Sequence, residues 1–133
     1  MSRTPFRVRF AETDAMGVAH HAAYLVWLEA ARVEWLHERD LSYRALEDEG
    51  VSLAVSELTL RYRLALKFDD AFHVETGLSE ARSRRCRFDY RVVLPDGALV
   101  ATAHSLHVPT SRAGRALRLP DGWLAALEAA RSR

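Results

Sequence analysis

The feature that most constrains the fold is a helix that is apolar on nearly every face. Between residues 20 and 39, large apolar side chains recur at the three- and four-residue spacing of an α-helix: Tyr24, Trp27, Leu28, Ala31 and Trp35. Other faces of the same helix also hold apolar residues, namely Leu25, Val26, Val33 and Leu36. A helix of this kind is normally buried rather than laid on a surface. The rest of the chain is therefore expected to wrap around it.

Most of the remaining sequence alternates apolar and polar residues with the period of two that is typical of half-buried strands. Strands are expected near residues 6–10, 57–66, 72–78, 85–92 and 98–108. The turn sequence Leu94-Pro95-Asp96-Gly97 predicts that the last two form an antiparallel hairpin. An antiparallel sheet wrapped around the apolar helix satisfies both patterns, so the predicted fold class is α+β.

Two shorter helices are also expected. Residues 42–49 form one, with Ser42 as its N-cap and Gly50 at its end. An Ala/Leu-rich helix near the C-terminus is expected to begin with Asp121 as its cap.

Length and composition bound the remaining possibilities. A chain of 133 residues and 15.0 kDa is expected to form a single domain, residues 1–133. The formal net charge of +1 gives no reason to expect nucleic-acid binding. Cys86 is the only cysteine, which excludes a disulfide within the chain and fits a reducing compartment. The N-terminus lacks the apolar run of a secretory signal, and no stretch approaches the roughly 18 apolar residues of a membrane span. We therefore expect a cytoplasmic protein.

The segment that carries candidate catalytic residues is the loop that leads into the long helix. It places an acidic residue, Asp14, and a glycine, Gly17, just before the predicted helix start. Unpaired backbone N–H groups and the positive end of the helix dipole gather at such a start. They can stabilise an oxyanion while a carboxylate attacks or directs a water molecule. The local chemistry leaves a simpler alternative open, in which Asp14 only caps the helix.

The spacing of this segment resembles a known family signature. The pattern is Asp14-x-x-Gly17-x-x-x-His21-x-x-Tyr24, followed by Leu28-Glu29-x-Ala31-Arg32. It resembles the 4-hydroxybenzoyl-CoA thioesterase family of hot-dog proteins, and most closely its bacterial acyl-CoA thioesterase branch, often encoded beside the Tol–Pal system. Further similar stretches are Lys67-Phe68-Asp69-Asp70, Arg87-Phe88-Asp89-Tyr90 and Pro120, so the likeness covers essentially the whole chain.

The resemblance implies a hot-dog fold and hydrolysis of an acyl-CoA to free acid and CoA. Asp14 would act as nucleophile or general base, and Gly17 would permit the tight turn of the loop. His21 would offer its backbone N–H to the carbonyl oxygen, with its side chain assisting. Tyr24 and His20 would border the acyl pocket. The resemblance also implies a homo-oligomer, a dimer or homotetramer, with each site lying between subunits.

Two residues depart from the family pattern. Relatives of the same branch often have tyrosine at the positions of Phe10 and His20. If the first tyrosine hydroxyl orients substrate or water, Phe10 cannot replace it. These departures concern acyl preference and rate rather than the role of Asp14.

Arginines supply nearly all of the positive charge and are candidates for holding the CoA phosphates. Arg85 and Arg87 share one face of a predicted strand, and Arg84 adjoins them. The alternative is that they form a solvated strand face. Arg115 and Arg118 are weaker phosphate candidates, whereas Arg61 and Arg63 are interpreted as surface residues.

Glu29 lies within the apolar helix and is expected to pair with Arg32, mainly in a structural role. In another branch of hot-dog thioesterases, however, a carboxylate on the central helix is the catalytic group. No metal site is expected: His104 and His107 should point to opposite faces of a strand. No cofactor is expected either, since CoA is part of the substrate. Two other functions stay open, a thioesterase acting on acyl carrier protein and a non-catalytic acyl-CoA-binding module.

Overall fold

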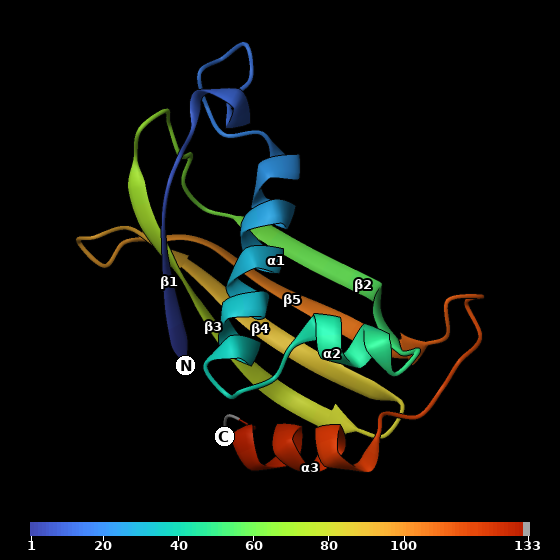
Figure 1. Ribbon diagram of the computed structural model, residues 1–133. Helices are drawn as coiled ribbons and strands as arrows, with labels where there is room; N and C mark the ends of the chain where they lie inside the picture. The colour runs from blue at the N-terminus through green and yellow to red at the C-terminus, as the bar shows by residue number, and fades with distance from the viewer. Residues whose placement is uncertain (132–133) are drawn as a thin grey trace.

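A computed structural model describes residues 1–131 and shows one antiparallel sheet curved around the long helix (Figure 1). The strand order across the sheet is β1-β3-β4-β5-β2. The strands are β1 (Ser2–Arg7), β2 (Ser52–Tyr62), β3 (Ala71–Arg82), β4 (Arg85–Val93) and β5 (Leu99–Thr110). The helices are η1 (Phe10–Glu12), α1 (His21–His37), α2 (Tyr43–Asp48) and α3 (Asp121–Ala130). The predicted α+β class is confirmed.

Helix α1 fills the concave side of the sheet because most of its apolar side chains face the strands. Leu28 and Trp35 are fully buried. The Trp35 ring packs edge-on against Phe88 of β4, with centroids 5.2 Å apart, and Trp27 packs against Phe72 of β3 at 4.6 Å. The helix is not enclosed on every side, however. Leu25 and Val26 are exposed, so one stripe of α1 remains uncovered in the single chain.

The sheet follows the predicted alternation closely. On β4, Cys86, Phe88 and Tyr90 are buried against the helix side, while the intervening Arg87 and Asp89 lie on the outer face. Strands β4 and β5 form the predicted antiparallel hairpin. Its turn contains Gly97 with a φ of +90°, a conformation that glycine adopts without a steric penalty.

Several element boundaries differ from the sequence expectation. Strand β1 begins at Ser2, four residues earlier than expected, and β3 extends to Arg82, four residues further. Strand β2 begins at Ser52 and ends at Tyr62, earlier at both ends than expected. Phe10 lies in the 3-10 turn η1 instead of a strand. Helix α3 has Pro120 as its N-cap residue and Asp121 as its first helical residue, so Asp121 as cap was wrong. By contrast, the Ser42 hydroxyl accepts a hydrogen bond from the Ala45 N–H at 3.3 Å, which confirms the predicted cap of α2.

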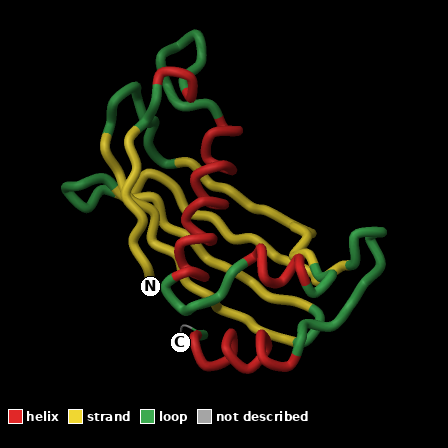
Figure 2. The backbone as a smooth tube through the Cα atoms, in the orientation of Figure 1, coloured by secondary structure: helices red, strands yellow, loops and turns green. Residues whose placement is uncertain are grey.

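Two features of this arrangement bear on the site. The start of α1 and the loop before it project beyond one end of the sheet (Figure 2). Strand β2 is one edge of the sheet, and β5 is its neighbour. None of the helices in residues 1–131 is long and apolar enough to cross a membrane.

Candidate active site

Asp14 is held in the loop by its own backbone neighbours. One carboxylate oxygen, Oδ1, accepts hydrogen bonds from the N–H of Met16 at 2.8 Å and of Val18 at 3.4 Å. The Asp14 carbonyl accepts the Gly17 N–H at 3.0 Å. Gly17 has a φ of +78°, as the predicted tight turn requires. The second carboxylate oxygen makes no hydrogen bond within residues 1–131, and Asp14 is exposed.

Helix α1 is capped by His20 and not by Asp14. His20 is the N-cap residue, and its Nδ1 accepts a hydrogen bond from the Ala23 N–H at 3.1 Å. Asp14 lies six residues before the N-cap. The simpler interpretation of Asp14 as a helix cap is therefore wrong for this chain.

The start of α1 retains free donors. The backbone N–H groups of His21 and Ala22 have no hydrogen-bond partner among the described residues. Free N–H groups at a helix start attract negative charge, and the helix dipole adds to this attraction. The geometry thus places the predicted oxyanion donor, the His21 N–H, at an accessible helix end.

Glu12 fixes the loop to the helix and was not singled out from the sequence. Its carboxylate accepts the Trp27 Nε1–H at 2.9 Å and the Arg9 N–H at 2.7 Å. Its backbone carbonyl accepts the His20 N–H at 3.0 Å. Burial alone would raise the pKa of Glu12, but the hydrogen bonds from Arg9 and Trp27 outweigh burial and hold it below the usual 4.5. A buried ionised carboxylate therefore ties the loop before α1 to the body of α1.

A pocket of about 560 Å³ opens where the loop, the start of α1 and the end of β2 meet. It is lined by four of the predicted site residues, namely Asp14, His20, His21 and Tyr24. Residues 62–65 form the opposite wall. Among them is Arg63. From the sequence alone, Arg63 was interpreted as a surface residue without a role in the site. The apolar and aromatic walls and the convergent polar groups are typical of a small-molecule site.

Two tyrosines form the aromatic part of this pocket. Tyr24 of α1 and Tyr62 of β2 pack edge to face, with ring centroids 5.1 Å apart. Burial, with a contribution from Tyr62, raises the pKa of Tyr24 to about 12. Tyr24 is therefore neutral at physiological pH and can only act as a hydroxyl group.

Phe10 lies outside the pocket. Its side chain is 77% exposed and packs edge-on against Phe68, with centroids 5.7 Å apart. Within one chain, the first of the two departures from the family pattern therefore does not alter the pocket wall, whereas His20 does line it.

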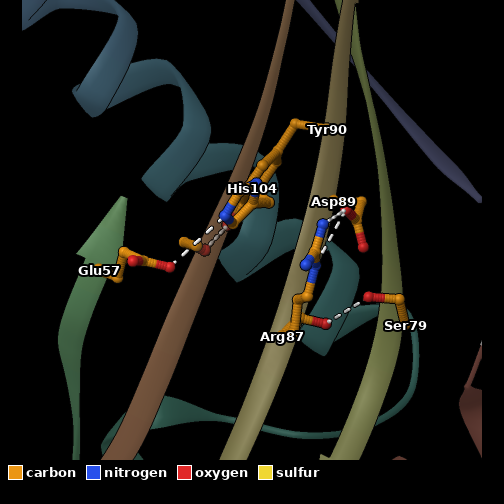
Figure 3. A network of polar contacts seen from close by, with 7 residues as sticks. Glu57, Ser79, Arg87, Asp89, Tyr90 and His104 are labelled. Atoms are coloured by element: carbon orange, nitrogen blue, oxygen red, sulfur yellow. Dashed lines mark hydrogen bonds and ion pairs between the residues drawn. The ribbon is translucent and has the colours of Figure 1, made fainter. Parts of the chain in front are cut away.

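The arginines proposed for CoA lie elsewhere on the molecule. Arg85 pairs with Glu80 at 2.8 Å, and Arg84 lies beside it in the turn between β3 and β4. Arg87 donates to Asp89 Oδ1 from Nε and Nη2, at 3.2 and 3.0 Å (Figure 3). None of the three lines the pocket around Asp14. Their role in binding CoA stays a prediction.

Glu29 and Arg32 do not form the predicted pair. Glu29 is exposed, whereas Arg32 is buried. The Arg32 guanidinium donates instead to the hydroxyls of Tyr43 at 2.8 Å and Tyr90 at 3.0 Å. The pairing failed because the two side chains point to different surroundings: Glu29 lies on the uncovered stripe of α1, and Arg32 faces the sheet.

The predicted orientation of the two histidines on the last long strand is confirmed. His104 and His107 lie on opposite faces of β5: His107 is fully buried, while His104 contacts Glu57 at 3.6 Å on the outer face (Figure 3). Cys86 is fully buried, and burial raises the pKa of its thiol to about 12, which fits an unreactive packing role.

Comparisons with known proteins agree with this geometry. The family model described as the thioesterase-like superfamily matches residues 8–127. The acyl-CoA thioester hydrolase YbgC of Escherichia coli O6:H1 is 34% identical over 106 residues, covering 80% of this chain and 79% of that protein. Among solved structures, a hypothetical protein of Thermus thermophilus, TT1821, matches with a TM-score of 0.93 and 40% identity, covering 98% of this chain and 100% of that chain. DHNA-CoA thioesterase from Staphylococcus aureus matches with a TM-score of 0.92 and 26% identity, covering 96% and 89%. The predicted hot-dog fold is confirmed.

Proposed function

We propose that Asp14 and the start of α1 together hydrolyse the thioester of an acyl-CoA. The chain belongs to the thioesterase-like superfamily and is an acyl-CoA thioesterase. The observation that supports the proposal most directly is that one pocket is lined by both Asp14 and the start of α1, where an Asp14 oxygen and the His21 N–H have no hydrogen-bond partner within residues 1–131. The family resemblance predicted from the Asp14-to-Tyr24 motif is confirmed.

In the proposed mechanism, the thioester carbonyl lies against the first turn of α1. The backbone N–H of His21 donates to the carbonyl oxygen, and the positive helix end stabilises the negative charge that develops there. The Nδ1 of His20 already accepts the Ala23 N–H, so this side chain closes the helix and lines the pocket at the same time. The His21 side chain lines the pocket as well, and its proposed role is to assist proton transfer.

Asp14 acts on the carbonyl carbon, directly or through a water molecule. The hydrogen bonds from Met16 and Val18 fix Oδ1 and leave the other oxygen available. Direct attack forms a mixed anhydride and releases the CoA thiolate, and water then cleaves the anhydride. In the alternative, Asp14 removes a proton from water as the water attacks. Either route yields the free acid and CoA, and neither requires a cofactor.

The polar part of CoA requires cations near the mouth of the pocket. Arg63 meets this need within the chain, since it is exposed and lines the pocket. Arg84, Arg85 and Arg87 are proposed to contribute in an oligomer, in which the arginines of one subunit approach the pocket of the next. Arginine suits phosphate because its planar fork donates two parallel hydrogen bonds.

A homo-oligomer with sites between subunits is also part of the proposal. Strand β2 is a free sheet edge, and Val55, Tyr62 and Leu64 along or beside it are exposed apolar side chains. Unpaired strand edges with apolar residues favour pairing with another chain. Because Tyr62 and Leu64 also line the pocket, a second copy seated on β2 would complete its wall.

The test compares Asp14→Asn with Asp96→Asn on a panel of acyl-CoA substrates. Asp96 is a matched control, since its Oδ1 accepts the Ala98 N–H at 2.9 Å in a similar local turn on a distant hairpin. Asparagine retains the acceptor oxygen in both turns, so the loop should keep its shape. We expect Asp14→Asn to lower kcat by about 100-fold or more, as for loss of a nucleophile or general base, and Asp96→Asn to match wild type. Comparable kcat values for the two variants would refute the role of Asp14.

A further inference from the structure

Arg32 is a buried cation without an anionic partner. Its side chain lies in the core with only 6% of the residue exposed, and it is the only arginine in residues 1–131 that is buried. No carboxylate of the described residues comes within 4.0 Å of it, whereas eight other arginines form ion pairs. An unpaired buried charge is costly, so its surroundings call for an explanation.

The guanidinium is held rigidly by neutral groups. Its two bonds to Tyr43 and Tyr90 continue into the core, where the Tyr90 hydroxyl meets the Ser105 hydroxyl at 2.7 Å. Ser105 in turn lies 2.7 Å from Nε2 of His107. Burial and the nearby Arg32 lower the pKa of His107 to about 3, so this histidine is neutral at physiological pH. In this hydrogen-bonded network of five side chains, Arg32 is therefore the only charged group.

Arg32 remains charged despite its burial. Burial disfavours the charged form, but contacts with Tyr90 and Tyr43 outweigh it and raise the pKa of the guanidinium. A guanidinium has five N–H donors, and the described residues occupy two of them. Three N–H donors are left, which is enough for a bidentate hydrogen bond to one anion.

The side chain borders a pocket of about 390 Å³ between α1, α2 and β2. Arg32 and Tyr43 supply polar lining, and Val33, Leu53 and Val55 supply apolar walls. Val55 lies at the rim, on the β2 edge that is also proposed as the contact with a second copy. None of the residues that line this pocket lines the pocket around Asp14. At roughly 30 Å³ for each water-sized group, the space suits a molecule of several non-hydrogen atoms.

We propose that this pocket is a second ligand site, which binds a small organic monocarboxylate through the Arg32 guanidinium. The planar fork matches a carboxylate, and the three apolar side chains suit a short hydrocarbon tail. Glu29 and Glu47 also line the pocket and are both exposed. Their charges disfavour a dianion such as phosphate more than a single carboxylate. The inference does not depend on the thioesterase mechanism.

The experiment titrates the intact protein with sodium butyrate and, as an uncharged ligand of the same shape, with butyramide. The readouts are the Arg32 Nε–H resonance in NMR spectra and the heat of binding, at constant ionic strength. We expect butyrate to shift the resonance saturably and butyramide to leave it unchanged. Saturable binding of phosphate without binding of butyrate would overturn the proposal, as would equal responses to butyrate and butyramide.

Charge variants at the pocket mouth locate the binding without disturbing the core. Glu29→Gln and Glu47→Gln should each strengthen butyrate binding about twofold, because each removes one negative charge near the ligand. Glu34→Gln is the matched control on α1, since Glu34 borders a different pocket, and it should bind as wild type. Arg32→Met should abolish binding; if that variant does not fold, the mouth variants decide alone. Equal affinities for Glu29→Gln, Glu47→Gln and Glu34→Gln would place butyrate elsewhere and refute the site.

Discussion

The surroundings of two carboxylates, Glu12 and Glu80, predict how much each contributes to stability. Glu12 and Glu80 both have carboxyl pKa values below 4.5, but for different reasons. Glu12 is buried, and besides the exposed Arg9 guanidinium at 3.1 Å its partners are the buried Trp27 indole and the Arg9 backbone N–H. Glu80 is bonded mainly to the exposed Arg85. Hydrogen bonds in a buried site are costly to lose, whereas exposed ion pairs contribute little.

The Glu12→Ala variant is expected to lose stability and activity together. It leaves the Trp27 indole N–H and the Arg9 N–H without their acceptor, which should cost roughly 1–3 kcal/mol in the free energy of unfolding. It also loosens the loop that contains Asp14, so kcat should fall. Urea unfolding and steady-state hydrolysis measure both effects. Glu80→Ala is the control, with a much smaller loss of stability and an unchanged kcat.

His107 predicts how stability depends on pH. Its folded pKa is lowered to about 3 by burial first and by Arg32 second, whereas the unfolded chain takes up the proton near 6.5. Between these values the unfolded state binds more protons, so stability is lost as the pH falls from 6.5 toward 3. The slope from this residue approaches about 1.4 kcal/mol per pH unit. Glu12 adds a further loss only below pH 4.5, because its folded pKa is depressed below that value.

The His107→Gln variant isolates this contribution. Glutamine cannot be protonated, so the free energy of unfolding should change less between pH 6 and pH 5 than in the wild-type protein. Urea unfolding at a series of pH values within this window tests the expectation. Parallel curves for the two proteins would show that His107 does not titrate as inferred.

At the scale of elements, long patterns were predictable and short ones were not. The regular alternation on β4 and the apolar periodicity of α1 gave both elements to within two residues, because each pattern extends over several repeats. The turn η1 has no such repeat, and Phe10 was assigned to a strand because it continues the alternation of Phe6 and Val8. The exposed stripe of α1 was also missed. The spacing of residues shows that a helix face is apolar, but it does not show whether another element covers that face.

The start of α1 was predicted as a site, but the residue that caps it was not. Histidine is an uncommon cap, and only the geometry shows Nδ1 of His20 accepting the Ala23 N–H. His20→Ala should lower the free energy of unfolding by about 1 kcal/mol, and His20→Asn should retain most of it, because asparagine is among the best N-cap residues. Urea unfolding of the three proteins makes the comparison. Equal stability of the alanine and asparagine variants would contradict the capping role.

At the scale of the whole molecule, the sequence motif predicted which residues meet, and the fold explains how. Asp14, His20, His21 and Tyr24 are close in sequence, so one loop and one helix turn suffice to gather them. Tyr62 and Arg63 join them only because the edge strand β2 ends beside the start of α1, which no local pattern predicts. The Arg32 network likewise joins α1, α2, β4 and β5 across long sequence separations.

The exposed edge of β2 makes a prediction about mass. If copies pair along this edge, a charge placed on it should separate them, because burying an unpaired charge in an interface is costly. Val55→Lys introduces a lysine on β2, and Val26→Lys introduces the same charge on the uncovered stripe of α1. The two valines are matched, with 51% and 56% of their surface exposed.

Light scattering should give a dimer or tetramer mass for the wild-type protein and for Val26→Lys, and a smaller mass for Val55→Lys. The acyl-CoA hydrolysis rate of Val55→Lys should fall as well, because Tyr62 and Leu64 would lose the neighbouring subunit that completes the pocket. A monomeric wild-type protein with full activity would show that the pocket of one chain is sufficient for the reaction.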